Sequence, residues 1–202
     1  MIPWFLGYNT KMVKKDELPK TYEELLIPKW KGRKIVLGSD NGSLILSGLI
    51  RVWGKEKAIR YFQQLAKQEP AIQAGAPSSR IQLVAAGEFP LTLASGNTLQ
   101  TFASRGAPVD WVPLEPVFVQ LNTIVLAAQS RHPNATKLFI DFVLSKKGQE
   151  MIRSFHRVPA RTGVDAEPPR IFKGFKRVVQ DIEAAASGED MTKLYNEILN
   201  IR

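Results

Sequence analysis

The chain has 202 residues, of which 44% are hydrophobic, and it contains no cysteine. This composition is typical of a globular protein with a core of ordinary size, and it excludes disulfides, thiolate metal sites and cysteine nucleophiles. The net charge is +9, and residues 131–177 carry eleven Lys and Arg against four Asp and Glu. A basic surface can bind nucleic acid or anionic lipid. A solvated face is the commoner meaning of such a surface, so we expect no nucleic-acid partner.

The sequence shows no membrane-targeting segment. No stretch approaches the roughly 20 apolar residues that span a bilayer. The apolar start, residues 1–6, lacks the charged leader, long apolar run and cleavage site of a signal peptide. We therefore expect neither a membrane span nor a signal peptide in this sequence.

Residues 4–112 predict strands that alternate with helices. Thr21 and Glu24 have the spacing of a capping box, and Gly54 and Gly87 are placed to end helices. Ser78 and Ser79 are good residues to cap the helix that ends at Gly87. The expected strands are residues 4–10, 34–37, 71–74, 90–94 and 109–112, and the expected helices are residues 21–26, 43–53, 55–67, 78–86 and 98–104. This alternation favours right-handed βαβ units and a parallel sheet.

The last third predicts one long extended run followed by helices. Residues 117–128 are extended, with Asn122 inside the run, and a strand of this length can pass between two lobes. Asn134 is placed to cap the next helix, and residues 157–170 are rich in Pro, Arg and Gly and predict irregular structure. The expected helices are residues 135–144, 146–155, 171–186 and 190–199. The predicted fold class is therefore α/β: a three-layer α/β/α lobe with a mostly parallel sheet, plus C-terminal helices.

Three polar loops follow predicted strands, at residues 39–43, 77–80 and 95–98. In a parallel sheet such loops gather at one edge, beside the amino ends of helices, where open α/β sheets bind ligands. Arg80 is the only cation between residues 68 and 104, which makes it the natural partner of a carboxylate or phosphate. Simple helix capping, and an arginine that reaches into solvent, are the structural alternatives. The candidate ligand contacts are Ser39, Asn41, Ser43, Ser78, Ser79, Arg80 and Asn97, with Asn122 as a weaker candidate.

Catalysis finds little support in the sequence. The only histidines, His132 and His156, lie in polar loops, and the acidic residues form no evident acid/base pair. There is no zinc-protease pair of histidines, no serine nucleophile elbow and no phosphate-binding glycine loop. We expect no enzyme activity, no catalytic residue, no metal site and no cofactor.

Several motifs, in this order and spacing, resemble a known family. They are GYNT at residues 7–10, PKWKGR at 28–33, QLVAAGEFPL at 82–91, LNT at 121–123, FIDFVLS at 139–145 and the GQ pair at 148–149. Together they resemble the bacterial solute-binding proteins of ABC importers, in the branch that includes the ferric-ion-binding receptors. The resemblance covers roughly residues 5–160 and implies the type 2 fold of periplasmic binding proteins.

The resemblance implies a domain organisation. Residues 1–19 correspond to an incoming strand and loop, residues 20–116 to the second lobe, and residues 117–202 to a returning strand and helices of a partial first lobe. Most of the first lobe has no counterpart in this sequence. We therefore expect poorly covered apolar surface on residues 1–10 and 117–202, and self-association through it.

The resemblance also implies a function. The chain is expected to be a non-catalytic receptor, periplasmic or extracellular, that binds a small polar or anionic solute and delivers it to a membrane permease. Ferric-binding relatives carry adjacent tyrosines after the strand that matches residues 90–94, and phenolate oxygens suit ferric iron. Here the loop is Ser95-Gly96-Asn97-Thr98, so ferric iron is not the expected solute. The alternatives are the effector-binding domain of a transcriptional regulator, which shares this fold, and an independent basic adaptor protein.

Overall fold

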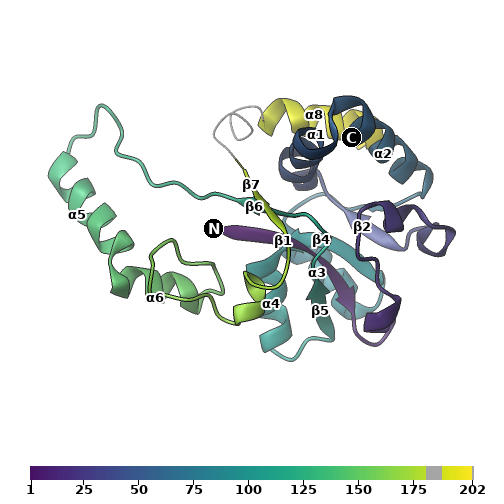
Figure 1. The fold of residues 1–202 in the computed structure, drawn as a ribbon, viewed down its shortest axis with the longest axis horizontal. Helices are drawn as coiled ribbons and strands as arrows, with labels where there is room; N and C mark the ends of the chain where they lie inside the picture. Colours follow the sequence, from purple (N-terminus) through teal and green to yellow (C-terminus); the bar gives the residue numbers. More distant parts are fainter. Residues whose placement is uncertain (181–187, 202) are drawn as a thin grey trace.

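The computed structural model describes residues 1–180 and 188–201, and it shows an α/β lobe from which two helices project (Figure 1). The sheet has the strand order β3-β2-β4-β1-β6-β7, and β5 also pairs with β1. Its strands are β1 (Ile2–Asn9), β2 (Ile35–Leu37), β3 (Ala71–Ile72), β4 (Leu91–Ser95), β5 (Val109–Val112), β6 (Val117–Gln120) and β7 (Arg177–Val179). The helices are α1 (Ser47–Trp53), α2 (Lys55–Lys67), α3 (Pro77–Ala86), α4 (Gly96–Ser104), α5 (Pro133–Leu144), α6 (Lys146–Ser154) and α8 (Gly188–Leu199). No described helix is long and apolar enough to cross a membrane.

The pairing confirms the mostly parallel α/β fold. β2 is parallel to β3 and β4, and β6 is parallel to β7. β1 is antiparallel to β4, β5 and β6, so every described strand except β1 runs in the same direction. Helices α1, α2 and α8 cover one face of the sheet, and α3 and α4 cover the other (Figure 1).

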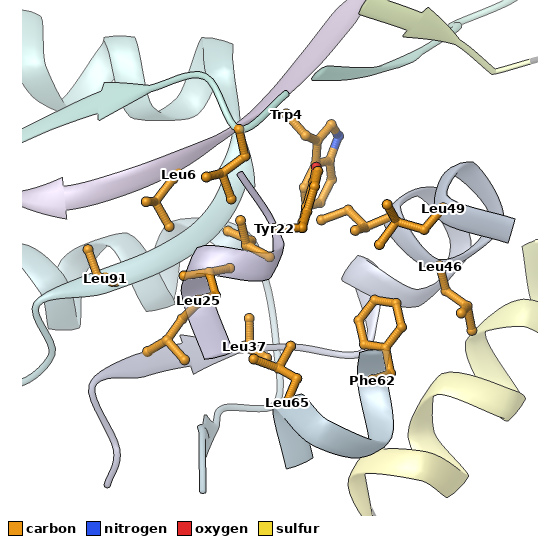
Figure 2. Packing of buried hydrophobic residues seen from close by; sticks show 14 of the residues in the cluster. Trp4, Leu6, Tyr22, Leu25, Leu37, Leu46, Leu49, Phe62, Leu65 and Leu91 are labelled. Carbon is orange, nitrogen blue, oxygen red and sulfur yellow. The ribbon is translucent and has the colours of Figure 1, made fainter. Parts of the chain in front are cut away.

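β1 lies at the centre of the core because both of its faces are apolar. All eight of its residues are buried, so the expectation of poorly covered apolar surface on residues 1–10 is wrong. Trp4, Leu6 and Tyr8 pack with the residues of α1 and α2, whereas Phe5 packs on the other face with α3 and α4. This alternation is the two-residue period of a strand. Figure 2 shows Trp4 and Leu6 among the leucines and aromatic rings of the first cluster. Gly7 is required here because a Cβ would collide with Leu99 of α4.

Most helix boundaries agree with the sequence, and the differences occur at the caps. α2 covers the predicted residues 55–67, and Gly87 ends α3 with the predicted left-handed backbone (φ 87°). Only half of the predicted capping box forms: the Glu24 N–H donates to Thr21 Oγ1, but the Glu24 carboxylate accepts from the Lys20 N–H instead of the Thr21 N–H. The caps predicted at Ser78 and Asn134 are wrong: α3 and α5 begin at Pro77 and Pro133, whose fixed φ suits the first helical position.

Two predicted elements in the last third are wrong. The run at residues 117–128 is a strand only to Gln120, because its neighbours end there: Gln120 pairs with Ile2, and Val119 pairs with Val179. The helix predicted over residues 171–186 is replaced by a 3-10 turn at Pro169–Ile171 and by β7, and residues 181–187 lie outside the described residues. The valines of β7 favour a strand when β6 is present to pair with it. Residues 157–168 are irregular, as predicted.

Three buried tyrosines make the stability of this core depend on pH. Burial raises the pKa of Tyr22, Tyr61 and Tyr195 above the ordinary value, and for Tyr195 the nearby Asp40 adds to the rise. The folded chain thus holds these protons at a pH where the unfolded chain has released them. Their contribution to stability is complete below pH 10 and is lost as the pH rises above it.

We therefore expect the free energy of unfolding to fall above pH 10, by about 1.4 kcal/mol per pH unit for each such tyrosine. The Tyr195 hydroxyl is buried without a hydrogen-bond partner among the described residues. Tyr195→Phe should then be near neutral at pH 7 and should fall less steeply than wild type from pH 10 to pH 12. Urea unfolding at several pH values measures both slopes, and equal slopes would contradict the prediction.

Candidate functional site

The carboxyl ends of β2, β3 and β4 lie at one edge of the sheet, because these strands are parallel neighbours. β6 ends at the same edge, since β1 pairs its first residues with both strands: Trp4 with Ser95, and Ile2 with Gln120. The three polar loops of the sequence therefore emerge side by side. We call this edge, with the loops that follow β2, β3 and β4, the loop edge.

An ion pair joins the first two loops. The Arg80 guanidinium donates to Asp40, with 2.6 Å between Nη2 and Oδ2, and also to the Gly75 carbonyl at 3.4 Å. The Arg80 side chain is fully buried, whereas that of Asp40 is 30% exposed. Gly38 is required beside this pair, because a Cβ there would collide with the guanidinium. The alternative of a solvent-facing Arg80 is therefore wrong.

Asn41 joins the first loop to β4. Its side-chain amide donates to the Leu93 carbonyl at 3.1 Å, and its oxygen accepts from the Gly38 N–H at 3.0 Å. The residue is fully buried. Asn41 therefore fixes the backbone of the loop after β2 against the neighbouring strand.

Three hydroxyl groups at the loop edge, unlike the Asn41 side chain, are not hydrogen-bonded to other described residues. Ser39, Ser78 and Ser79 are half-buried, and none of their hydroxyls has a hydrogen-bond partner among the described residues. Ser78 and Ser79 occupy the first turn of α3, and the Ser79 N–H donates to the Ala76 carbonyl at 3.0 Å. The three hydroxyls can bind a polar or anionic atom without breaking an existing contact.

The other candidates are spread along the same edge. Ser43 belongs to the π-helical turn Gly42–Leu46. Asn97 is in the first turn of α4, and its Oδ1 is buried without a partner among the described atoms. Asn122 is exposed, two residues beyond the end of β6. The structure brings Asn41 and Arg80 together around Asp40, and direct contact of all eight candidates with a solute stays a prediction.

Sequence reasoning missed Asp40 and one side of α4. The sequence did offer a reason to single out Asp40 as a partner for Arg80, because it is the only acidic residue in the loop that follows β2. Thr101 and Ser104 share a face of α4 with Asn97, and together with Arg105, which follows the helix, they line a hollow of about 510 Å³. The opposite wall of that hollow comes from residues 152–157, and no local pattern predicts that this distant segment packs there.

Comparison with known proteins places this geometry in a family. Residues 2–175 match the family model described as bacterial extracellular solute-binding protein. Iron uptake protein A1 of Synechocystis sp. is 28% identical over 173 residues, which are 78% of this chain and 48% of the relative. The chain therefore spans about half the length of the curated relatives it matches.

Solved structures share the fold. Iron-bound HitA of Pseudomonas aeruginosa superposes with a TM-score of 0.78 at 22% identity, over 98% of this chain and 67% of that one. The periplasmic binding protein AfuA of Actinobacillus pleuropneumoniae, with fructose-6-phosphate bound, gives a TM-score of 0.74 at 19% identity, over 100% of this chain and 67% of that one. At these identities the likeness concerns the fold.

Proposed function

Since the chain belongs to the bacterial extracellular solute-binding protein family, we propose that it is the solute-binding component of an ABC importer. The family match over residues 2–175 is the observation that carries the proposal. The fold and family are those of binding proteins, and the proposal extends this to the absence of catalysis. The loop edge supports a binding role, because it holds unpaired hydroxyls on a backbone fixed by Asn41 and the Arg80–Asp40 pair.

The proposed solute is small and polar or anionic. Hydroxyl and amide groups beside the start of a helix suit oxygen-rich or negatively charged groups. Ser39, Asn41, Ser43, Ser78, Ser79, Arg80, Asn97 and Asn122 remain the proposed contacts. Arg80 and Asn41 are both fully buried, so they contact a solute only if their bonds to Asp40, Gly38 and Leu93 open. While these bonds are closed, the two side chains position the loop.

The buried tyrosines argue against ferric iron as the solute, although HitA is iron-bound and the Synechocystis relative is named for iron uptake. Phenolate is the form of tyrosine that binds ferric iron. Tyr8, Tyr22, Tyr61 and Tyr195 are all buried in the core, and burial raises the pKa of each, which disfavours the phenolate. The loop after β4 contains no tyrosine.

The proposal includes a location, partners and a division into parts. The receptor works outside the cytoplasmic membrane and delivers its solute to the importer's permease. In the proposed division, residues 20–116 form the second lobe, residues 1–19 lead into it, and residues 117–202 return toward a first lobe. β1, β6, β7 and α8 of the two flanking parts pack in the same sheet and core as residues 20–116. The cleft between the lobes holds the solute, so the loop edge supplies one half of the contacts.

Native mass spectrometry of the purified chain tests the proposal by detecting a small molecule that co-purifies. With the solute identified, calorimetry of the Ser78→Ala/Ser79→Ala double variant should show binding weakened about tenfold, since two neutral hydrogen bonds are lost. Ser130→Ala, which removes a hydroxyl before α5, is the matched control and should bind like wild type. Unchanged affinity in the double variant would remove the first turn of α3 from the site.

A further inference from the structure

The hollow between α4 and the end of α6 concentrates positive charge that nothing in the described structure neutralises. Its nine lining residues are Asn97, Thr101, Ser104, Arg105, Ile152, Ser154, Phe155, His156 and Arg157. None of these is acidic. Arg105 and Arg157 have no ion-pair or side-chain hydrogen-bond partner among the described residues, whereas the nearby Arg153 pairs with Glu167 at 3.8 Å. Two guanidinium groups therefore flank a concave surface with their donors unused.

The polar groups between the two arginines are also suited to an oxyanion. Ser104 Oγ donates to the Thr101 carbonyl at 3.1 Å and lies 3.4 Å from His156 Nε2, so the imidazole of one wall meets the hydroxyl of the other. Asn97 adds a side-chain amide whose oxygen is buried without a partner among the described atoms. Its amide can turn to offer either its N–H group or its oxygen.

The size and shape of the hollow suit a small molecule better than a bare ion. Its volume of about 510 Å³ lies within the range of small-molecule sites. Ile152 and Phe155 form an apolar part of the wall, and Phe155 is 63% exposed. A ligand with an anionic end and a carbon skeleton would use both parts.

We propose that this hollow binds the phosphate group of a small phosphorylated solute, with Arg105 and Arg157 as its charged contacts. One guanidinium group can donate two parallel hydrogen bonds to two oxygens of the same phosphate. Two guanidiniums and an imidazole offer more N–H donors than the two oxygens of a carboxylate accept, and a phosphate group has more oxygens to receive them. The hydroxyls of Thr101, Ser104 and Ser154 already donate to backbone carbonyls, so they are not counted among these donors. The inference rests on the proposed function, because it names the chemical class of the solute, and Asn97 connects the hollow to the loop edge.

Calorimetry of the whole chain with inorganic phosphate and glycerol 3-phosphate as probes tests the inference. Arg105→Gln and Arg157→Gln should each weaken binding about ten- to a hundredfold, the usual effect of losing a charge-assisted contact. Arg60→Gln on the exposed side of α2 removes the same charge elsewhere and should bind like wild type. Thermal unfolding should be unchanged in all three variants, because none of these arginines belongs to the described core.

Three outcomes overturn the inference. The first is absence of phosphate binding by wild type, and the second is an equal loss in Arg60→Gln, which indicates non-specific attraction to a basic protein. The third is binding of phosphatidylglycerol vesicles without binding of either soluble probe, which assigns the hollow to a membrane surface. If a neutral solute co-purifies while phosphate does not bind, the receptor function stands and this inference fails. If phosphate binds but Ser78→Ala/Ser79→Ala has no effect on solute affinity, the phosphate site in the hollow is supported and the solute contacts proposed at α3 are rejected.

Discussion

Asp40→Asn is expected to lower the free energy of unfolding by about 3 kcal/mol, at the low end of the range for breaking a buried ion pair. The loss is large because Arg80 is fully buried and would keep its charge without a carboxylate beside it. The expected loss stays at the low end of the range because the side-chain amide oxygen in Asp40→Asn can still accept one hydrogen bond from Arg80. Urea unfolding monitored by circular dichroism measures the difference.

The partner and control variants separate the ion pair from other effects. Arg80→Met should cost less than Asp40→Asn, because Asp40 is 30% exposed and water can reach its carboxylate. The double variant should then resemble Arg80→Met, so the coupling energy between the two sites should be about 3 kcal/mol, the whole cost of Asp40→Asn. Glu69→Gln breaks the exposed pair with Lys31 (3.6 Å) and should cost no more than about 1 kcal/mol. Equal losses in Asp40→Asn and Glu69→Gln would show that burial adds nothing to the pair.

Local patterns were sufficient to predict the alternation of strands and helices in the lobe. The apolar run before residue 94 and the helical spacing in residues 55–67 each fix a local structure, and the structure has β4 and α2 there. The antiparallel direction of β1 cannot be predicted from its own residues, because an apolar strand can pair in either direction. β7 was missed for a related reason: its three residues form a strand only through pairing with β6, which lies about 60 residues earlier.

The candidate site was predictable in place and less so in its contacts. Parallel strands dictate that the loops after β2, β3 and β4 meet at one edge. Which side chains pair there depends on distances between loops, and 40 residues separate Asp40 from Arg80. The same limit applies to the hollow beside α4, whose second wall is formed by residues 152–157.

The chain is expected to self-associate through the apolar face of α5 and the segment before it. Residues 121–126 and α5 extend away from the lobe (Figure 1), and α5 packs mainly against α6. The large side chains left exposed in this region are Leu121, Ile124, Val125, Leu126, Leu138, Phe139, Phe142, Leu144, Met151 and Phe155. Val125 and Leu138 are 75% and 71% exposed. Many large apolar side chains exposed in one region mark an interaction site, because covering them removes apolar area from water.

Sedimentation velocity over a hundredfold concentration range should therefore show dimers or larger species that dissociate on dilution. Leu138 and Phe142 lie four residues apart on one face of α5, so Leu138→Gln/Phe142→Gln should shift the chain to monomer. Val52→Gln, which changes a 45%-exposed valine on α1, is the control and should leave self-association unchanged. A wild-type monomer at the highest concentration would mean that this face is covered within the chain in solution, with α5 folded back on the lobe. Amide hydrogen exchange of α5 would then be slow, whereas an uncovered α5 that packs only on α6 should exchange quickly in dilute solution and slow as the dimer forms.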